Sequence, residues 1–210
     1  MCKTIETSIN AFIVSFVTGI ILLSSPQKIH KANGLILWSF CFIQLCDATI
    51  HYSIREKLPK LNLFVSKYLI PLILFSEAPI IYYATYQLTG KRMIWFEFLL
   101  IIYVIFGMLS HTHYCTKITS QSSPNDFLQW CQTTSYNWAK FLFLFFLIMA
   151  AYKYPNNIYK LVACIILITA FVANFNNASF GSGWCHQSNI LAIIWLGMYL
   201  MDIPSKISIF

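Results

Sequence analysis

Charged residues are scarce in this chain. Asp, Glu, Lys and Arg make up 10% of its 210 residues, whereas hydrophobic residues make up 58%. A soluble domain carries about 25% charged residues, so this composition cannot cover a surface that faces water. It excludes an ordinary soluble enzyme or binding domain. It predicts an integral membrane protein whose residues 1–210 form a single transmembrane domain with the lipid bilayer as its main partner.

The chain also lacks long runs of basic residues. Its net charge is +7, but the Lys and Arg residues stand singly or in short groups at the ends of apolar segments. Basic residues anchor helices at lipid headgroups in such positions, so the charge does not predict a nucleic-acid partner. No apolar segment has a Lys near its middle, which excludes a retinal protein. The sequence motifs of G-protein-coupled receptors are absent as well.

Apolar segments dominate what is there. A transmembrane helix needs about 20 apolar residues, and the links between the segments carry Pro or Gly as helix breakers. The sequence therefore predicts an all-α bundle of seven transmembrane helices with its two termini on opposite sides of the membrane. The predicted helices are 8–25, 34–54, 64–88, 93–112, 138–153, 158–176 and 184–203.

The orientation of the bundle rests on small differences in charge. Seven basic residues fall on each side, but the first helix has one Lys before it and two after it, and the link 177–183 has no basic residue. These details favour an N-terminus outside the cell or in a lumen, although the basic cluster at 55–67 points the other way. If the N-terminal side is oxidising, Cys115 and Cys131 are expected to form a disulfide; otherwise they are free thiols.

Polar residues inside the second predicted helix form a stripe. Gln44, Asp47 and His51 span about 60° of one helical face, so they are expected to point into the bundle. Ionisable groups at membrane depth are costly and often functional. The stripe either binds helices together through hydrogen bonds or supplies a ligand or proton site.

The third predicted helix carries Glu77 near its midpoint, between Pro71 and Pro79. Each proline removes a backbone donor and frees a carbonyl one turn earlier, so we expect a kink around the acid. Glu77 is either a neutral acid bonded to a freed carbonyl or a proton or cation site.

Most histidines fall in the half of the bundle nearest the N-terminus. His186 opens the last predicted helix, with Asn189 one turn further on, and His111 ends the fourth. Histidine is a common zinc ligand, so these residues predict either a zinc site or interfacial side chains bonded to backbone and water. The candidate zinc ligands are Asp47, His51, His111 and His186. The wider predicted pocket comprises Gln44, Asp47, His51, Glu77, His186 and Asn189.

The link 174–189 is polar and rich in glycine. Gly181 and Gly183 flank Ser182, which predicts a tight turn with Ser182 or Gly183 as the N-cap of the last helix. We expect this turn to fold over the pocket with Trp184 packed below it.

Two resemblances accompany these patterns. The run from Gly181 to Cys185, together with the segment 42–47, resembles motifs in uncharacterised multi-pass membrane proteins of large DNA viruses. Seven helices with His and Asp near one face also resemble the alkaline ceramidase and adiponectin-receptor superfamily of zinc amide hydrolases, whose paired histidines in the last helix are absent here.

Three functions remain open from the sequence. The first is a membrane protein that handles or senses ions or small molecules through a polar pocket. The second is a metal-dependent lipid or amide hydrolase embedded in the membrane. The third is a structural viral or organellar membrane protein.

Overall fold

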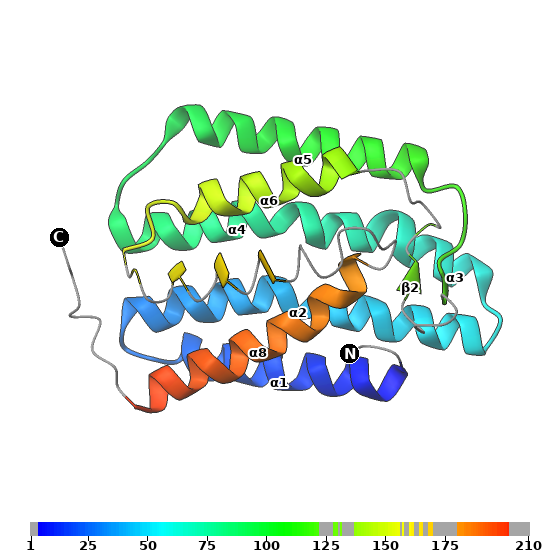
Figure 1. Cartoon of the computed structure of the whole chain (residues 1–210), viewed down its shortest axis with the longest axis horizontal. Helices are drawn as coiled ribbons and strands as arrows, with labels where there is room; N and C mark the ends of the chain where they lie inside the picture. Colours follow the sequence, from blue (N-terminus) through cyan, green and yellow to red (C-terminus); the bar gives the residue numbers. More distant parts are fainter. Residues whose placement is uncertain are drawn as a thin grey trace.

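The computed structural model describes residues 4–121, 128–129, 131, 137–155, 157, 160–161, 164–165, 168–169 and 180–201. Long helices lie side by side along one axis of the molecule (Figure 1). In chain order the described elements are α1 (Ile5–Leu23), α2 (Lys28–Arg55), α3 (Pro59–Phe64), the π-helix η1 (Val65–Leu69), α4 (Ile70–Thr89), α5 (Ile94–Tyr114), β1 (Ser120–Gln121), β2 (Leu128–Gln129), α6 (Asn137–Ala151) and α8 (Phe180–Leu200).

Four helices are long and apolar enough to cross a membrane. They are α1, α2, the continuous stretch Pro59–Thr89 and α5, and shorter apolar stretches lie in α6 and α8. Large apolar side chains project outward from α1 and α5, among them Ile13, Ile94 and Phe98. Such a surface suits hydrocarbon better than water. The structure is compatible with an integral membrane protein.

Six of the seven predicted segments coincide with described helices, counting Pro59–Thr89 as one. The predicted helix 158–176 lies mostly outside the described residues, so the described part of the chain shows six long helices and not seven. The start of α2 differs most from the prediction, since the helix begins at Lys28 and not at 34. The first turns of α2 are polar in sequence, but His30 and Asn33 there are buried.

Helix α2 is the centre of the bundle. It packs against α1, α4 and α8, while α4 also packs against α5 and α6. The close approach of α1 and α2 depends on Gly19 and Gly34: a methyl group at Gly34 would lie 2.8 Å from the carbonyl oxygen of Gly19. Trp38 of α2 also donates its indole N–H to the carbonyl of Phe16, at 3.3 Å.

The predicted turn before the last helix is wrong at Gly181, Ser182 and Gly183. These residues lie inside α8, which begins at Phe180. Glycine inside a helix costs only about 1 kcal/mol relative to alanine. At membrane depth, leaving backbone groups without hydrogen bonds costs more than that, so an extra helical turn is favoured. The start of α1 and the end of α8 lie at opposite ends of the bundle (Figure 1).

Candidate functional site

The polar stripe of α2 faces the other helices. Gln44 and Asp47 are fully buried, and His51 is 7% exposed. Gln44 donates a hydrogen bond to the Ser188 hydroxyl on α8. The next residue of α8, Asn189, accepts a hydrogen bond from the Ser15 hydroxyl of α1, at 2.8 Å. The expectation that the second helix neighbours the last one is therefore confirmed, and three helices meet around these side chains.

Some predicted site residues have side chains outside the described part of the structure. This holds for His186, Trp184 and Cys185, whose backbone lies in the first turns of α8. The expected closeness of Asp47, His51 and His186 stays a prediction.

Two buried polar residues of α2 were missed in the sequence. The His30 ring packs edge-on against the Tyr199 ring of α8, with centroids 5.0 Å apart. Asn33 is fully buried and accepts a hydrogen bond from the Tyr154 hydroxyl. At 100° per residue, His30, Asn33, Gln44, Asp47 and His51 fall within an arc of about 100°. That spacing was visible in the sequence, but it was interrupted by the apolar stretch between Asn33 and Gln44.

Glu77 is the most isolated ionisable group in the described part of the chain. Its side chain is 0% exposed, and neither carboxyl oxygen has a hydrogen-bond partner among the described residues. The Tyr103 hydroxyl of α5 is likewise buried without such a partner and lies within electrostatic reach of Glu77. Burying a charged carboxylate without a partner is very costly. The Glu77 carboxyl group is therefore stable in this position only when it is protonated or when it binds a cation.

The direction of Glu77 follows from its neighbour Phe75, whose ring packs beneath Gly107 of α5. Two residues along a helix point about 160° apart, so Glu77 faces away from this contact. The Tyr103 ring stacks on Phe146 of α6, with centroids 4.2 Å apart, and packs edge-on against Phe75, with centroids 5.3 Å apart.

The buried polar groups are spread through the depth of the bundle. With a rise of 1.5 Å per residue, Asp47 lies about 12 Å and Gln44 about 16 Å from the end of α2 at Arg55. The start of α3 at Pro59 lies at the same end of the bundle as Arg55, and Glu77 lies about 27 Å from it along the helix. Asn33 lies about 33 Å from the end of α2 at Arg55. Measured along the helix axes, the longest interval between successive groups is therefore on the order of 10 Å, and Glu77 lies at the level of the apolar gap of α2.

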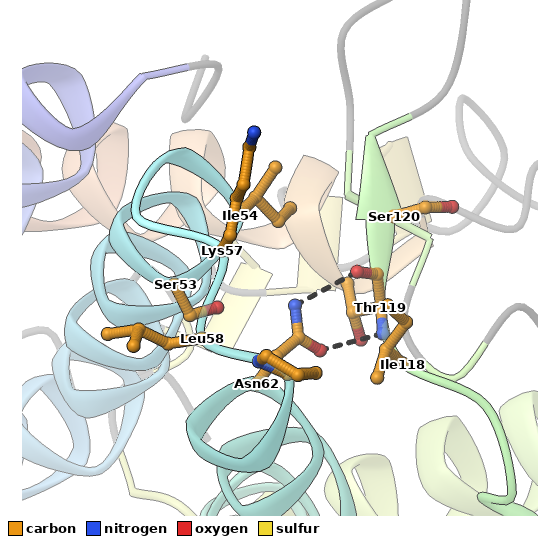
Figure 2. Close-up of a pocket in the computed structure, with 9 residues that line it drawn as sticks. Ser53, Ile54, Lys57, Leu58, Asn62, Ile118, Thr119 and Ser120 are labelled. Carbon is orange, nitrogen blue, oxygen red and sulfur yellow. Dashed lines mark hydrogen bonds between the residues drawn. The ribbon is translucent and has the colours of Figure 1, made fainter.

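A second polar cluster lies where α3 meets the segment after α5. The Asn62 side chain pairs with the backbone of Thr119, donating to its carbonyl oxygen at 3.0 Å and accepting from its N–H at 2.8 Å (Figure 2). The Ser66 and Thr119 hydroxyls are 2.6 Å apart, and Thr119 also accepts the Cys131 N–H at 3.0 Å. These bonds fix the segment after α5 on α3 and η1.

A cavity of about 420 Å³ opens beside this cluster (Figure 2). It lies at the end of the bundle where α2 ends, and none of the predicted pocket residues lines it. Lys57 extends along its rim, away from the Asn62–Thr119 pair. The lining residues are Ser53, Ile54, Lys57, Leu58, Pro59, Asn62, Ile118, Thr119 and Ser120.

Cys115 and Cys131 form a disulfide, with their Cα atoms 5.0 Å apart. This is the pairing expected if the N-terminal side is oxidising. His111, one turn before Cys115, donates from Nε2 to the carbonyl oxygen of Ser66 at 3.0 Å, and the same nitrogen lies 3.6 Å from Cys131 Sγ. Ser66 belongs to η1, and π-helical turns are often found at functional sites.

The candidate zinc ligands are not gathered in one place within the described residues. There, the one group of His, Cys, Asp and Glu with metal-ligand spacing is His111, Cys115 and Cys131. Neither Asp47 nor His51 belongs to it, and the position of the His186 side chain lies outside the described residues. The predicted set of four ligands therefore stays a prediction. The contacts of His111 with Ser66 and Cys131 do not support it.

No protein-family model, curated protein or solved structure that was compared with the chain matches it.

Proposed function

We propose that this protein is an integral membrane protein that conducts or exchanges protons, or a small cation, along the buried polar groups of its bundle. The observation that carries the proposal is Glu77, a fully buried carboxyl group at mid-depth without a described partner. A merely structural polar group would be expected to have its hydrogen bonds satisfied. An acid left unsatisfied is suited to gain and lose a proton or bind a cation as the bundle fluctuates.

The remaining polar groups support this proposal by their position. The buried stripe of α2 leads from His51 toward Gln44, and Asn33 and His30 continue the same face beyond the apolar gap. Intramembrane proton paths consist of such acids, histidines and amides, linked by water. In this proposal Asp47 is the entry acid, Glu77 is the central acid, and His186 and Asn189 complete the entry side.

The topology of the proposal includes seven crossings, with 158–176 as the sixth, and an N-terminus outside the cell or in a lumen. The Cys115–Cys131 disulfide supports this orientation because disulfides persist in oxidising compartments. The resemblance to membrane proteins of large DNA viruses is retained as a proposal of origin. A zinc-dependent hydrolase is not carried forward, because within the described residues neither Asp47 nor His51 joins His111 in a cluster with metal-ligand spacing.

Proton movement can be measured in vesicles that contain the purified protein and a pH-sensitive dye. A pH gradient should collapse faster than in empty vesicles, and Glu77→Gln should return the rate to that of empty vesicles. Glu97→Gln is the matched control, because Glu97 lies on the partly exposed side of α5, bonded to Arg92 and Tyr82. Equal rates for empty vesicles and wild-type vesicles, with proton and cation gradients alike, would refute the proposal.

A further inference from the structure

The cluster around His111 has the composition of a metal site, although two of its members are joined by a disulfide. His111 lies in the last turn of α5, and Cys115 caps the end of that helix, donating its N–H to the carbonyl oxygen of His111 at 2.8 Å. Cys131 reaches them from the segment beyond β2. The three ligand atoms all lie within 4.8 Å of one another. His111 is partly buried, and both cysteines are nearly inaccessible to water.

We propose that reduction of the Cys115–Cys131 disulfide turns this cluster into a binding site for a thiophilic divalent metal such as zinc, held by Cys115, Cys131 and His111. This inference does not depend on the proposed proton path. It assigns a different ligand set from the histidines and acid that the sequence analysis considered.

The distances suit a tetrahedral ion. Zinc bonds are about 2.3 Å to sulfur and about 2.0 Å to nitrogen, so ligand atoms in a tetrahedral site stand about 3.5 Å apart. His111 Nε2 already lies 3.6 Å from Cys131 Sγ. The Ser66 carbonyl oxygen lies 3.0 Å from the same nitrogen and 3.7 Å from the same sulfur. That oxygen, or a water molecule, is placed to be the fourth ligand.

The chemistry requires a reductant, which we name as a dithiol. Two of its thiol groups transfer two electrons and two protons to the disulfide, giving two cysteine thiols and an oxidised dithiol. Metal binding then releases the proton of each thiol. The His111 proton that is now donated to Ser66 moves to Nδ1, which leaves the Nε2 lone pair for the metal.

The contacts around the cluster favour a fixed position, in both redox states, for the segment after α5 that carries Cys131. The segment is already fixed to α3 and η1 by Asn62, Ser66 and Thr119. Cys131 has a positive φ of 56°, which costs energy for a residue other than glycine and requires other contacts to hold it. The disulfide supplies that restraint on the oxidising side of a membrane. A metal supplies it in a chain whose thiols are still reduced.

The test uses the full chain with Cys2, Cys41, Cys46, Cys164 and Cys185 replaced by alanine, so that only the two cluster thiols remain. The protein is purified in detergent, reduced with a phosphine and titrated with Co²⁺ alone. Thiol labelling confirms the reduction. We expect about one ion per chain, with the d–d absorption of a tetrahedral site and a sulfur-to-cobalt charge-transfer band. Zn²⁺ added afterwards should abolish both signals.

Two comparisons make the test decisive. His111→Ala should weaken binding at least about tenfold while the charge-transfer band persists. Reduced protein whose two thiols are alkylated after folding should lose the band altogether, which avoids a variant that fails to fold. A Co²⁺ spectrum without the sulfur band, an unchanged spectrum after alkylation, or a disulfide that cannot be opened in the folded protein would each overturn the proposal.

Discussion

Single side chains fix the segment after α5 to the end of the bundle where α2 ends and α3 begins. Asn62 is the clearest case, because its amide satisfies both the N–H and the C=O of one buried residue outside any helix. Buried backbone groups without partners cost about 1–3 kcal/mol each. One amide on α3 thus substitutes for the hydrogen bonds that regular secondary structure would have provided to Thr119.

Replacement of Asn62 by alanine should therefore lower the free energy of unfolding by about 2 kcal/mol or more. It should also make the segment after α5 more susceptible to proteolysis. Denaturant unfolding in detergent micelles measures the first effect. Thr49→Ala is the matched control, since Thr49 is not buried and its hydroxyl donates to the Leu45 carbonyl oxygen of its own helix; its effect should stay within about 0.5 kcal/mol. Equal stability of the two variants would show that the Asn62 pairing contributes nothing.

At the scale of the helices, the sequence predicted most of the fold. Long apolar segments locate six helices because a bilayer requires such lengths. The early start of α2 was missed, since burial of His30 and Asn33 depends on partners from α8 and from Tyr154. Helix α8 begins at Phe180 and not at 184, because Gly181 and Gly183, which favour a turn in the sequence, lie inside the helix. The inward direction of the α2 stripe followed from its period, whereas the isolation of Glu77 depends on packing that no sequence pattern records.

The contact between α1 and α2 gives a prediction at this scale. In Gly34→Ala the new methyl group would meet backbone atoms of Gly19 and Leu23 at under 3.0 Å, so the two helices must separate. Overpacking of this kind costs about 1–3 kcal/mol. Gly197→Ala is the control, because a methyl group there has no atom of the described residues within 4 Å. In the interior of α8 it should gain up to about 1 kcal/mol. Opposite signs of the two unfolding free-energy changes are expected, and equal signs would contradict the close approach.

Across the described residues, polar groups such as Gln44, Asp47 and Glu77 are buried inside the bundle, while many large apolar side chains lie on its surface, the arrangement expected of a bundle in lipid. Its first helix begins and its last described helix ends at opposite ends of the bundle (Figure 1). Labelling reporters fused to the two termini should therefore respond from opposite compartments. Reporters that respond from one compartment would mean an even number of crossings.

In the proposed function, the buried Glu77 carboxyl exchanges its proton with water through the bundle. Infrared spectroscopy of the protein in lipid measures this directly, because a neutral carboxyl group has a carbonyl stretching band that shifts when its proton is replaced by deuterium. We expect a band that is present in wild type, absent in Glu77→Gln and shifted soon after transfer to D₂O. A band assigned to Glu77 that does not shift while the protein stays folded in D₂O would show a sealed structural acid and would contradict the proposal.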